Sequence, residues 1–453
     1  MGNTNQNQSE SKLKNIHTIV VTVGAIVAMI GVIAGVLFGI YDRRLKADSN
    51  PSPQPIPNIT TTNTTTTTQT TTTAIEIDNA DDFEYTIKNN EVTIVKYIGN
   101  DSNVIIPSII DGYPVTIIGE EAFWEYEKLE NMNIPNSVTT IEARAFDKCI
   151  GLTSVDIPNS VTDIGDWSFS HCDKLKSITL GTGVNNIGVG AFYASAIKNI
   201  TIPNCVTTIG KLTFSRCVNL ISISIPNSVE YIGDEIFDVC TNLSRIDVST
   251  DNNTYSSVDG ILYNKNQTML IRYPEGKKEA IYDIPCSVTT IDGRAFGWCK
   301  NLMKINADVN SINYSSIDGV LFNKEQTVLI KYSEGRAETS YDIPNSIIRI
   351  ESRAFGGTKL TNINIPYGVT SIGYSALSGC NITSLEIPES VERIEDCAFW
   401  GCRNLVSVTI PSSVIQIQGK HVFYDCPNVV IYGYTGSEAE RYATDNSIRF
   451  VPL

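Results

Sequence analysis

The cysteines and histidines are the residues of this chain with the widest choice of chemistry. The 453 residues include eleven Cys and three His. These residue types could form disulfides, hold a zinc ion or supply a thiol nucleophile and its base. The sequence has no Cys-x-x-Cys pair, no His within ligand spacing of two Cys, and no nucleophile elbow, phosphate loop or dinucleotide fingerprint. We therefore expect no catalytic residue, no cofactor and no metal site.

Two of the histidines, His171 and His421, lie far apart in a repeating pattern described below. At least eight repeats separate them. Stacked strands are about 4.8 Å apart, so the two side chains are predicted to be about 38 Å or more from each other. They cannot share one site.

Eight of the cysteines occupy one recurring position. Seven of them lie 15 residues after the Ile of an Ile-Pro dipeptide, as Cys149 does after Ile134. The eighth, Cys426, lies 16 residues after Ile410. Equivalent side chains in stacked strands point in parallel, whereas a disulfide prefers facing side chains. We predict a column of small buried thiols rather than disulfide bridges. Its members are Cys149, Cys172, Cys217, Cys240, Cys299, Cys380, Cys402 and Cys426.

The elements that position these cysteines and histidines come from an internal repeat that is marked by Ile-Pro. Two of the steps between markers, from Ile225 to Ile284 and from Ile284 to Ile343, are much longer than the others. One such unit cannot bury its apolar face alone, so the pattern predicts a β-rich solenoid of about 11 repeats of about 22–23 residues, with two longer hairpin-containing units. The markers are Ile134, Ile157, Ile202, Ile225, Ile284, Ile343, Ile365, Ile387 and Ile410, and Leu180 fills a missing place.

Residues 152–172 show how the sequence of one repeat predicts its local structure. Val155 and Ile157 alternate with polar neighbours, as in a short half-buried strand. Pro158 has no amide hydrogen and ends the strand. Phe169 then fills the wide end of the repeat, and stacking is expected to join these side chains into continuous core columns.

The two long units and both ends of the repeat region depart from this pattern. Asp259-Gly260 and Asp318-Gly319 lie between apolar runs and predict hairpins. Ser437 and Glu440 have the spacing of a capping box and predict a short helix near the C-terminus. We predict an N-terminal cap with a variant first repeat over residues 76–123, the solenoid over 124–432 and a C-terminal cap over 433–453.

The N-terminal part is expected to anchor the chain. Residues 18–41 are uncharged and mainly apolar, and as a helix they would be about 36 Å long, sufficient to cross a hydrocarbon core of ~30 Å. This run exceeds the apolar core of a signal peptide, so we predict a transmembrane helix after a short tail, residues 1–17. Residues 42–75 contain four Pro and a run rich in Thr, which predicts a disordered stalk.

The sequence gives weaker evidence on the orientation of this anchor in the membrane and on its self-association. Basic residues flank both ends of the helix, so the positive-inside rule does not decide its orientation. The Pro/Thr-rich stalk is typical of extracellular segments and favours a single-pass cell-membrane protein with its repeats outside. Gly31, Gly35 and Gly39 share one helix face and could join two helices in a homodimer. The alternative is that Gly is simply frequent in membrane helices.

A candidate binding face lies along the predicted strands. The residues three places and one place before eight of the ten markers are mostly small and polar, and strand alternation puts both sets on one face of a sheet. We call these two sets the polar columns; the alternative is a solvated face without a ligand. They comprise Asn131, Asn133, Ser154, Asp156, Ser177, Thr179, Asn199, Thr201, Ser222, Ser224, Asn362, Asn364, Ser384, Glu386, Ser407 and Thr409.

Charge limits the class of partner. The formal net charge is −15 and the pI is near 4.8. A nucleic-acid surface needs clustered Lys and Arg, so nucleic acid is not an expected partner. An extracellular protein or glycan is expected instead, besides the membrane that residues 18–41 would contact.

The repeats resemble the BspA-type leucine-rich repeats of bacterial and protist surface proteins. One copy reads Ile134-Pro135-Asn136-Ser137-Val138, Ile141, Ala145-Phe146 and Cys149. The resemblance covers about residues 83–453 and implies a leucine-rich-repeat-like curved solenoid with a role in adhesion. The family has no shared catalytic residue, so an enzyme is not expected. An adhesin is the preferred interpretation, and a structural surface-coat or spacer protein is the alternative.

Overall fold

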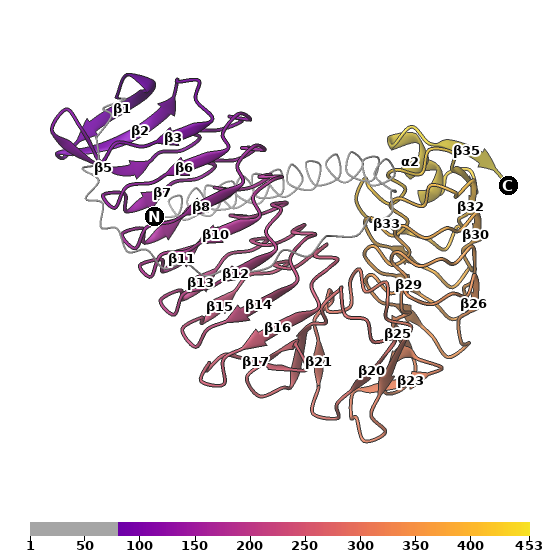
Figure 1. The fold of residues 1–453 in the computed structure, drawn as a ribbon. Coiled ribbons are helices and arrows are strands. Elements are labelled where there is room, and N and C mark those ends of the chain that lie inside the picture. Colours follow the sequence, from indigo (N-terminus) through magenta and orange to yellow (C-terminus); the bar gives the residue numbers. More distant parts are fainter. Residues whose placement is uncertain (1–79) are drawn as a thin grey trace, which may run out of the picture. The chain divides into compact units, whose positions relative to one another are not determined.

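Residues 80–453 are the part of the chain that the structure, a computed structural model, describes. The predicted tail (1–17), membrane span (18–41) and stalk (42–75) lie outside the described residues. Within residues 80–453, no helix has the length and apolar character needed to cross a membrane. The described residues form a β-solenoid, in which short strands follow one another in chain order (Figure 1).

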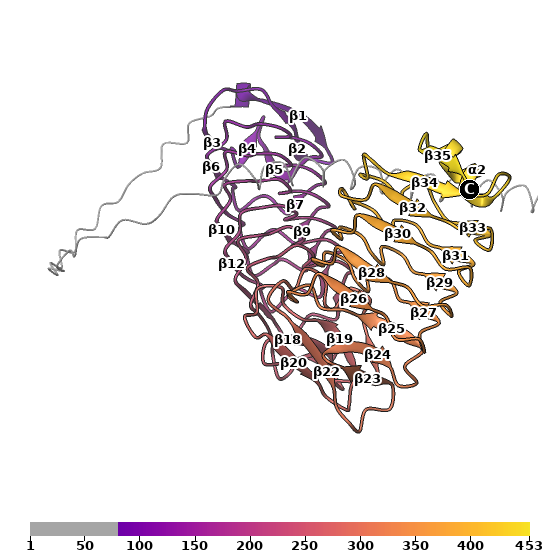
Figure 2. The same ribbon diagram turned by 90° about the vertical axis from the view of Figure 1, so that its right-hand side faces the viewer.

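Two ladders of short strands build the first part of the solenoid, and Figure 2 shows them on different sides of the stack. Strands of successive turns pair in parallel, as a solenoid requires. One ladder contains β3 (Asn103–Ile105), β6 (Asn131–Asn133), β8 (Ser154–Asp156), β10 (Ser177–Thr179), β12 (Asn199–Thr201), β14 (Ser222–Ile225) and β16 (Arg245–Val248). The other contains β1 (Phe83–Lys88), β2 (Glu91–Tyr97), β4 (Ile109–Ile110), β5 (Tyr113–Ile118), β7 (Thr140–Ile141), β9 (Asp163–Ile164), β11 (Asn186–Ile187), β13 (Thr208–Ile209) and β15 (Tyr231–Ile232).

The two long units each contain the predicted hairpin. Asp259 and Gly260, and likewise Asp318 and Gly319, all have positive φ, which fits the tight turn between antiparallel strands. The strands of the first unit are β17 (Tyr255–Val258), β18 (Ile261–Asn264), β19 (Met269–Arg272), β20 (Ile281–Ile284), β21 (Thr290–Ile291) and β22 (Lys304–Ala307). Those of the second are β23 (Tyr314–Ile317), β24 (Val320–Asn323), β25 (Val328–Lys331), β26 (Ser340–Asp342) and β27 (Arg349–Ile350).

Regular turns resume after the second long unit and end in the C-terminal cap. The capping helix α2 (Glu438–Asp445) begins after Ser437, whose side chain accepts the backbone N–H of Glu440. Its predicted position is therefore confirmed. At the other end of the solenoid, β1 and β2 form an antiparallel hairpin. The remaining strands are β28 (Asn362–Asn364), β29 (Ser371–Ile372), β30 (Ser384–Glu386), β31 (Arg393–Ile394), β32 (Ser407–Thr409), β33 (Gln416–Ile417), β34 (Val430–Gly433) and β35 (Arg449–Pro452).

The number of turns differs from the sequence-based prediction. The described residues make about 16 turns, whereas the Ile-Pro markers predicted about 11 repeats. The markers undercount because several strands that complete a turn, such as β16, β22 and β34, are not followed by Ile-Pro. These turns lie next to the hairpins and the C-terminal cap, where the chain leaves the regular pattern.

The core consists of columns of equivalent side chains. Successive Phe rings from Phe123 to Phe237 are stacked, with centroids 5.0–6.1 Å apart. Beside them, each thiol of the predicted column is buried and donates to the carbonyl of the aromatic or Leu residue one turn earlier. Cys149, for example, donates to the Phe123 carbonyl at 3.1 Å. All eleven cysteines are unpaired, and burial raises the pKa of Cys217 to about 12.

Candidate functional site

The polar columns lie on exposed strand faces in the register expected from the sequence. In β8, β10, β12, β28 and β30 an exposed residue, a buried residue and a second exposed residue follow one another. Ser177 pairs with Ser154 on one side and with Asn199 on the other. Ser222, Ser407 and Thr409 are half-buried, whereas the other members are exposed. The local geometry thus presents hydroxyl and amide groups to solvent in rows.

Hydroxyl and amide groups also bond to one another along the stack. The Asn131 amide donates to Asn103 Oδ1 of the preceding turn at 2.7 Å. The Thr153 hydroxyl donates to the Glu130 carbonyl at 3.1 Å and to Asn131 Oδ1 at 3.3 Å. Such bonds orient part of the row without removing it from solvent. The face is chemically suited to hydrogen bonding with an extended polar partner.

The row is interrupted where the hairpins occur, which the sequence analysis did not anticipate. The strands that carry the polar columns belong to three separate sheets, of seven, two and four strands. The hairpin of β17 and β18 folds beside β16, and the Ile246 amide donates to the Gly260 carbonyl at 2.9 Å. A Cβ on Gly260 would lie 2.7 Å from the Arg245 side chain, so this close approach requires glycine.

The strands of the long units add residues to the same face that the sequence analysis missed. These residues are more charged and more apolar than the polar columns. Arg245 Nε donates to Asp247 Oδ2 at 2.6 Å, and the Asn306 amide donates to Asp283 Oδ1 at 2.8 Å. Aligning β16 and β22 with the regular strands would have found four of them, although no Ile-Pro marks these two strands. The other four lie on β20 and β26, directly before the markers Ile284 and Ile343. The added positions are Arg245, Asp247, Ile281, Asp283, Lys304, Asn306, Ser340 and Asp342.

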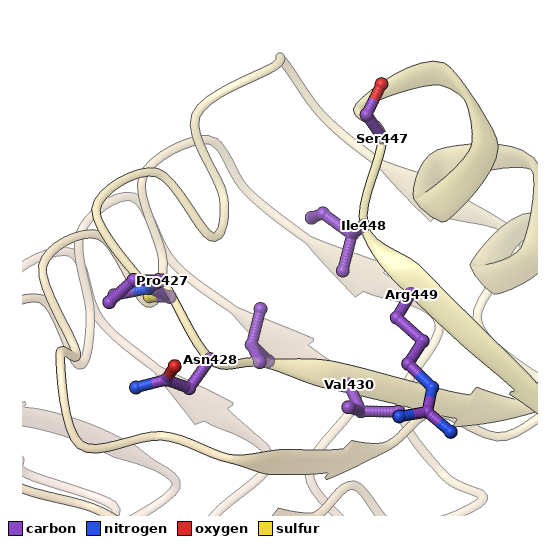
Figure 3. A pocket seen from close by; sticks show the side chains of 8 residues that line it. Pro427, Asn428, Val430, Ser447, Ile448 and Arg449 are labelled. Atoms are coloured by element: carbon purple, nitrogen blue, oxygen red, sulfur yellow. The ribbon is translucent and has the colours of Figure 1, made fainter.

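A pocket of about 350 Å³ lies at the C-terminal end of the solenoid (Figure 3). Residues 426–430 form one wall and residues 447–449 the other. Arg449 contributes a guanidinium group and Asn428 an amide, but the lining contains no carboxylate or imidazole. This lining has no acid–base pair for proton transfer.

A cluster of potential metal ligands lies at the edge of the C-terminal regular turns. One side-chain ligand atom from each of Asp396, Cys397 and His421 lies within 4.8 Å of the others. The expectation of no metal site rested on local Cys and His spacing and did not consider partners one turn away. The register of the repeat could have revealed this cluster. Cys397 and His421 each lie two residues before a core Phe, so they occupy equivalent positions in adjacent turns.

Each of the two described histidines has its own aspartate. His171 Nδ1 lies 3.5 Å from Asp147 Oδ1 and 3.3 Å from the Ser170 hydroxyl. His421 Nδ1 lies 3.4 Å from Asp396 Oδ2. The two pairs occupy separate parts of the solenoid. Within residues 80–453, a third potential metal ligand accompanies the His421 pair and not the His171 pair.

Comparison with known proteins identifies the repeat. The model of the BspA type leucine-rich repeat region matches residues 92–220, 177–270, 277–336 and 331–437. No curated protein sequence matches the chain. The family match covers both the regular turns and the two long units.

Solved structures include similar solenoids. A leucine-rich repeat protein from Eubacterium ventriosum is 24% identical with a TM-score of 0.50, and the match covers 74% of this chain and 90% of that one. A leucine-rich cell-surface protein from Faecalibacterium prausnitzii is 27% identical with a TM-score of 0.46, covering 80% and 95%. A leucine-rich repeat protein from Bacteroides ovatus is 25% identical with a TM-score of 0.43, and the match covers 82% of this chain and 98% of that one.

Proposed function

Because the chain belongs to the BspA-type leucine-rich repeat family, we propose that it is a cell-surface protein whose solenoid binds another macromolecule as an adhesin. The observation that supports this most directly is the exposed row of Ser, Thr, Asn and Asp side chains on β8, β10 and β12. These groups offer many donors and acceptors at a regular spacing of about 4.8 Å. An extended protein segment or a glycan has complementary groups along its length.

The location of the protein is part of the same proposal. Residues 18–41 would form a single-pass anchor in the cell membrane, with residues 80–453 outside the cell. The uncharged run and the Pro/Thr-rich segment after it support this arrangement. Self-association through Gly31, Gly35 and Gly39 remains a prediction. No enzymatic role is proposed, because the family is generally one of non-catalytic binding proteins.

The test is attachment of cells that display the full chain. Cells would be applied to surfaces coated with extracellular-matrix proteins and to a glycan array. The binding variant replaces Ser154, Ser177, Asn199 and Ser222 with Arg, which places bulky cations along the row. Its control replaces the corresponding residues of the other ladder in the same four turns with Arg: Asp163, Asn186, Thr208 and Tyr231.

The adhesin proposal predicts saturable attachment that the first variant abolishes and the control variant retains. Added protease should remove the repeats from intact cells. Attachment that both variants reduce equally would contradict the assignment to this face. Absence of saturable attachment to every matrix protein and glycan would favour the second candidate, a surface-coat or spacer protein, which the uniform small side chains of the row also suit.

A further inference from the structure

We propose that Asp396, Cys397 and His421 form a binding site for a single divalent cation of the zinc class. The three side chains supply an oxygen, a sulfur and a nitrogen ligand, the donor set that Zn²⁺ accepts. All three are partly exposed, and the side chains of His421 and Asp396 are 31% and 32% accessible. Solvent can therefore reach a fourth coordination position.

The register of the solenoid brings the ligands together. Cys397 precedes Phe399 by two residues, and His421 precedes Phe423 by two. The Phe399 amide donates to the Val422 carbonyl at 3.0 Å, which fixes these turns as neighbours. Equivalent residues of adjacent turns are about 4.8 Å apart. The thiol and the imidazole are therefore neighbours through the fold, although a whole repeat separates them in the chain.

The turn that carries His421 contains one extra residue, which makes room for the Asp396 carboxylate. The step from Ile394 to Cys397 is three residues, whereas the corresponding step from Ile417 to His421 is four. Gly419 lies in this longer segment with a φ of +75°, and a Cβ there would overlap the Asp396 side chain. The Asp396 carboxylate thus occupies space that any other residue at position 419 would fill.

The distance between the Asp396 and His421 ligand atoms matches one edge of a tetrahedral zinc site. Asp396 Oδ1 accepts the backbone N–H of His421 at 3.0 Å, which orients the carboxylate and leaves Oδ2 facing the imidazole. Oδ2 and Nδ1 are 3.4 Å apart, which is long for an N–H···O hydrogen bond. It is close to the ligand–ligand distance of about 3.3 Å that bonds of about 2.0 Å to a tetrahedral zinc ion produce.

Neighbouring groups hold the thiol in place. Tyr374 forms a side-chain hydrogen bond with Cys397, and the Arg353 guanidinium lies over the Tyr374 ring, 4.9 Å from its centroid. Burial raises the pKa of the Cys397 thiol to about 11, and the charge of Asp396 acts in the same direction. A bound cation would coordinate the thiolate and release the thiol proton to solvent.

The experiment uses the full chain in detergent and a competition titration of Zn²⁺ against a chromophoric chelator, with Co²⁺ as a spectroscopic probe. We expect one zinc equivalent whose affinity falls about 100-fold or more in Cys397→Ser and in His421→Gln, since even outer-shell changes cost 10–100-fold. The Co²⁺ complex should show a thiolate charge-transfer band that Cys397→Ser removes. Ca²⁺ and Mg²⁺ should not compete.

Two matched variants control for the other ligands of the chain. His171→Gln removes the histidine of the second His–Asp pair, and Cys286→Ser removes an exposed thiol. Both should leave the high-affinity equivalent unchanged. The proposal is overturned if Cys397→Ser or His421→Gln retains that equivalent while circular dichroism shows a folded chain, or if the Co²⁺ spectrum lacks a thiolate band.

Discussion

Neighbouring turns are connected by different groups in the regular turns and in the two long units. In the regular turns, backbone groups near the Phe column bond directly to the next turn, as in the bond from Phe146 N to the Ser168 carbonyl at 2.8 Å. In the first long unit, a buried arginine and glutamate lie between the turn of Phe237 and that of Phe296. The comparison shows that a buried ionic group can replace backbone hydrogen bonds where a hairpin separates two turns.

Arg272 and Glu275 form the bridge of the first long unit. They are 5% and 3% exposed, and they bond to each other. Arg272 also donates to the carbonyls of Phe237 at 3.0 Å and Arg294 at 2.8 Å. Glu275 Oε1 accepts the Val239 amide at 2.9 Å. The two side chains thus satisfy backbone groups of the turns on both sides.

The second long unit repeats the arrangement with lysine in place of arginine. Lys331 Nζ donates to the Arg353 carbonyl at 3.1 Å and lies 3.6 Å from Glu334 Oε1. Glu334 Oε1 accepts the Trp298 amide at 3.0 Å. The lysine bonds to fewer carbonyls than Arg272, because an ammonium group lacks the planar fork of donors. We therefore expect the first bridge to be the more sensitive to substitution.

The largest effect is expected when Arg272 is replaced. Arg272→Met leaves Glu275, Asp238 and two backbone carbonyls without their buried donor, and breaking a buried ion pair typically costs about 3–5 kcal/mol. The free energy of unfolding, measured by urea denaturation at about pH 9, where Glu275 is ionised, should fall by this amount. Arg245→Met is the control, because Arg245 pairs with Asp247 at the surface and such pairs contribute about 0–1 kcal/mol.

If Arg272 and Glu275 act as a bridge, a second substitution should restore part of the stability that Arg272→Met loses. Adding Glu275→Gln removes the more deeply buried of the two carboxylates that lose Arg272, while keeping an acceptor for the Val239 amide; the other carboxylate, Asp238, remains. The double variant should therefore recover part of the lost stability. If Arg272→Met were no more harmful than Arg245→Met, the buried bridge would contribute nothing to the stacking of these turns.

The buried glutamates should also make stability depend on pH. Burial raises the pKa of Glu275 to about 8, although the Arg272 guanidinium opposes the shift and Asp238 adds to it. Burial raises the pKa of Glu334 in the same direction. Between about pH 4.5 and 8 the folded chain then holds more protons at Glu275 than the unfolded chain. Its contribution to the free energy of unfolding should decrease as pH rises through this window.

Urea denaturation at pH 5, 6, 7 and 8 measures this dependence. The difference between the native chain and Glu275→Gln isolates the glutamate from the other titrating groups. The native chain should lose stability relative to the variant as pH increases. A difference that stays constant, or changes in the opposite direction, would show that Glu275 is ionised throughout the window.

Much of the regular architecture was predictable from sequence, whereas these bridges were not. The alternation around Val155, the stop at Pro158 and the capping residue Ser437 act within a few residues of their own positions. By contrast, Glu275 accepts an amide 36 residues earlier, and Asp396 meets a histidine 25 residues later. Their roles depend on the exact register of stacked turns and on the path of the hairpins. The same reason explains why the interruption of the polar columns by the hairpins was not predicted.

The smallest effect should come from the apolar columns of the regular turns. Ile164 is fully buried and aligned with Ile141 and Ile187 in adjacent turns. Ile164→Val removes one methylene group and should lower the free energy of unfolding by about 0.5–1.5 kcal/mol. Ile394→Val, in a separate core cluster, should cost a similar amount in the same denaturation experiment.

The combination of these two variants tests whether the long units couple the regular regions. If the bridges make residues 80–453 unfold as one unit, one transition should show both losses, additive within about 0.5 kcal/mol because the two sites share no contacts. If the regular regions unfold separately, each substitution would shift only its own transition. Arg272→Met should then increase that separation, because turns of a solenoid stabilise one another only through their immediate neighbours.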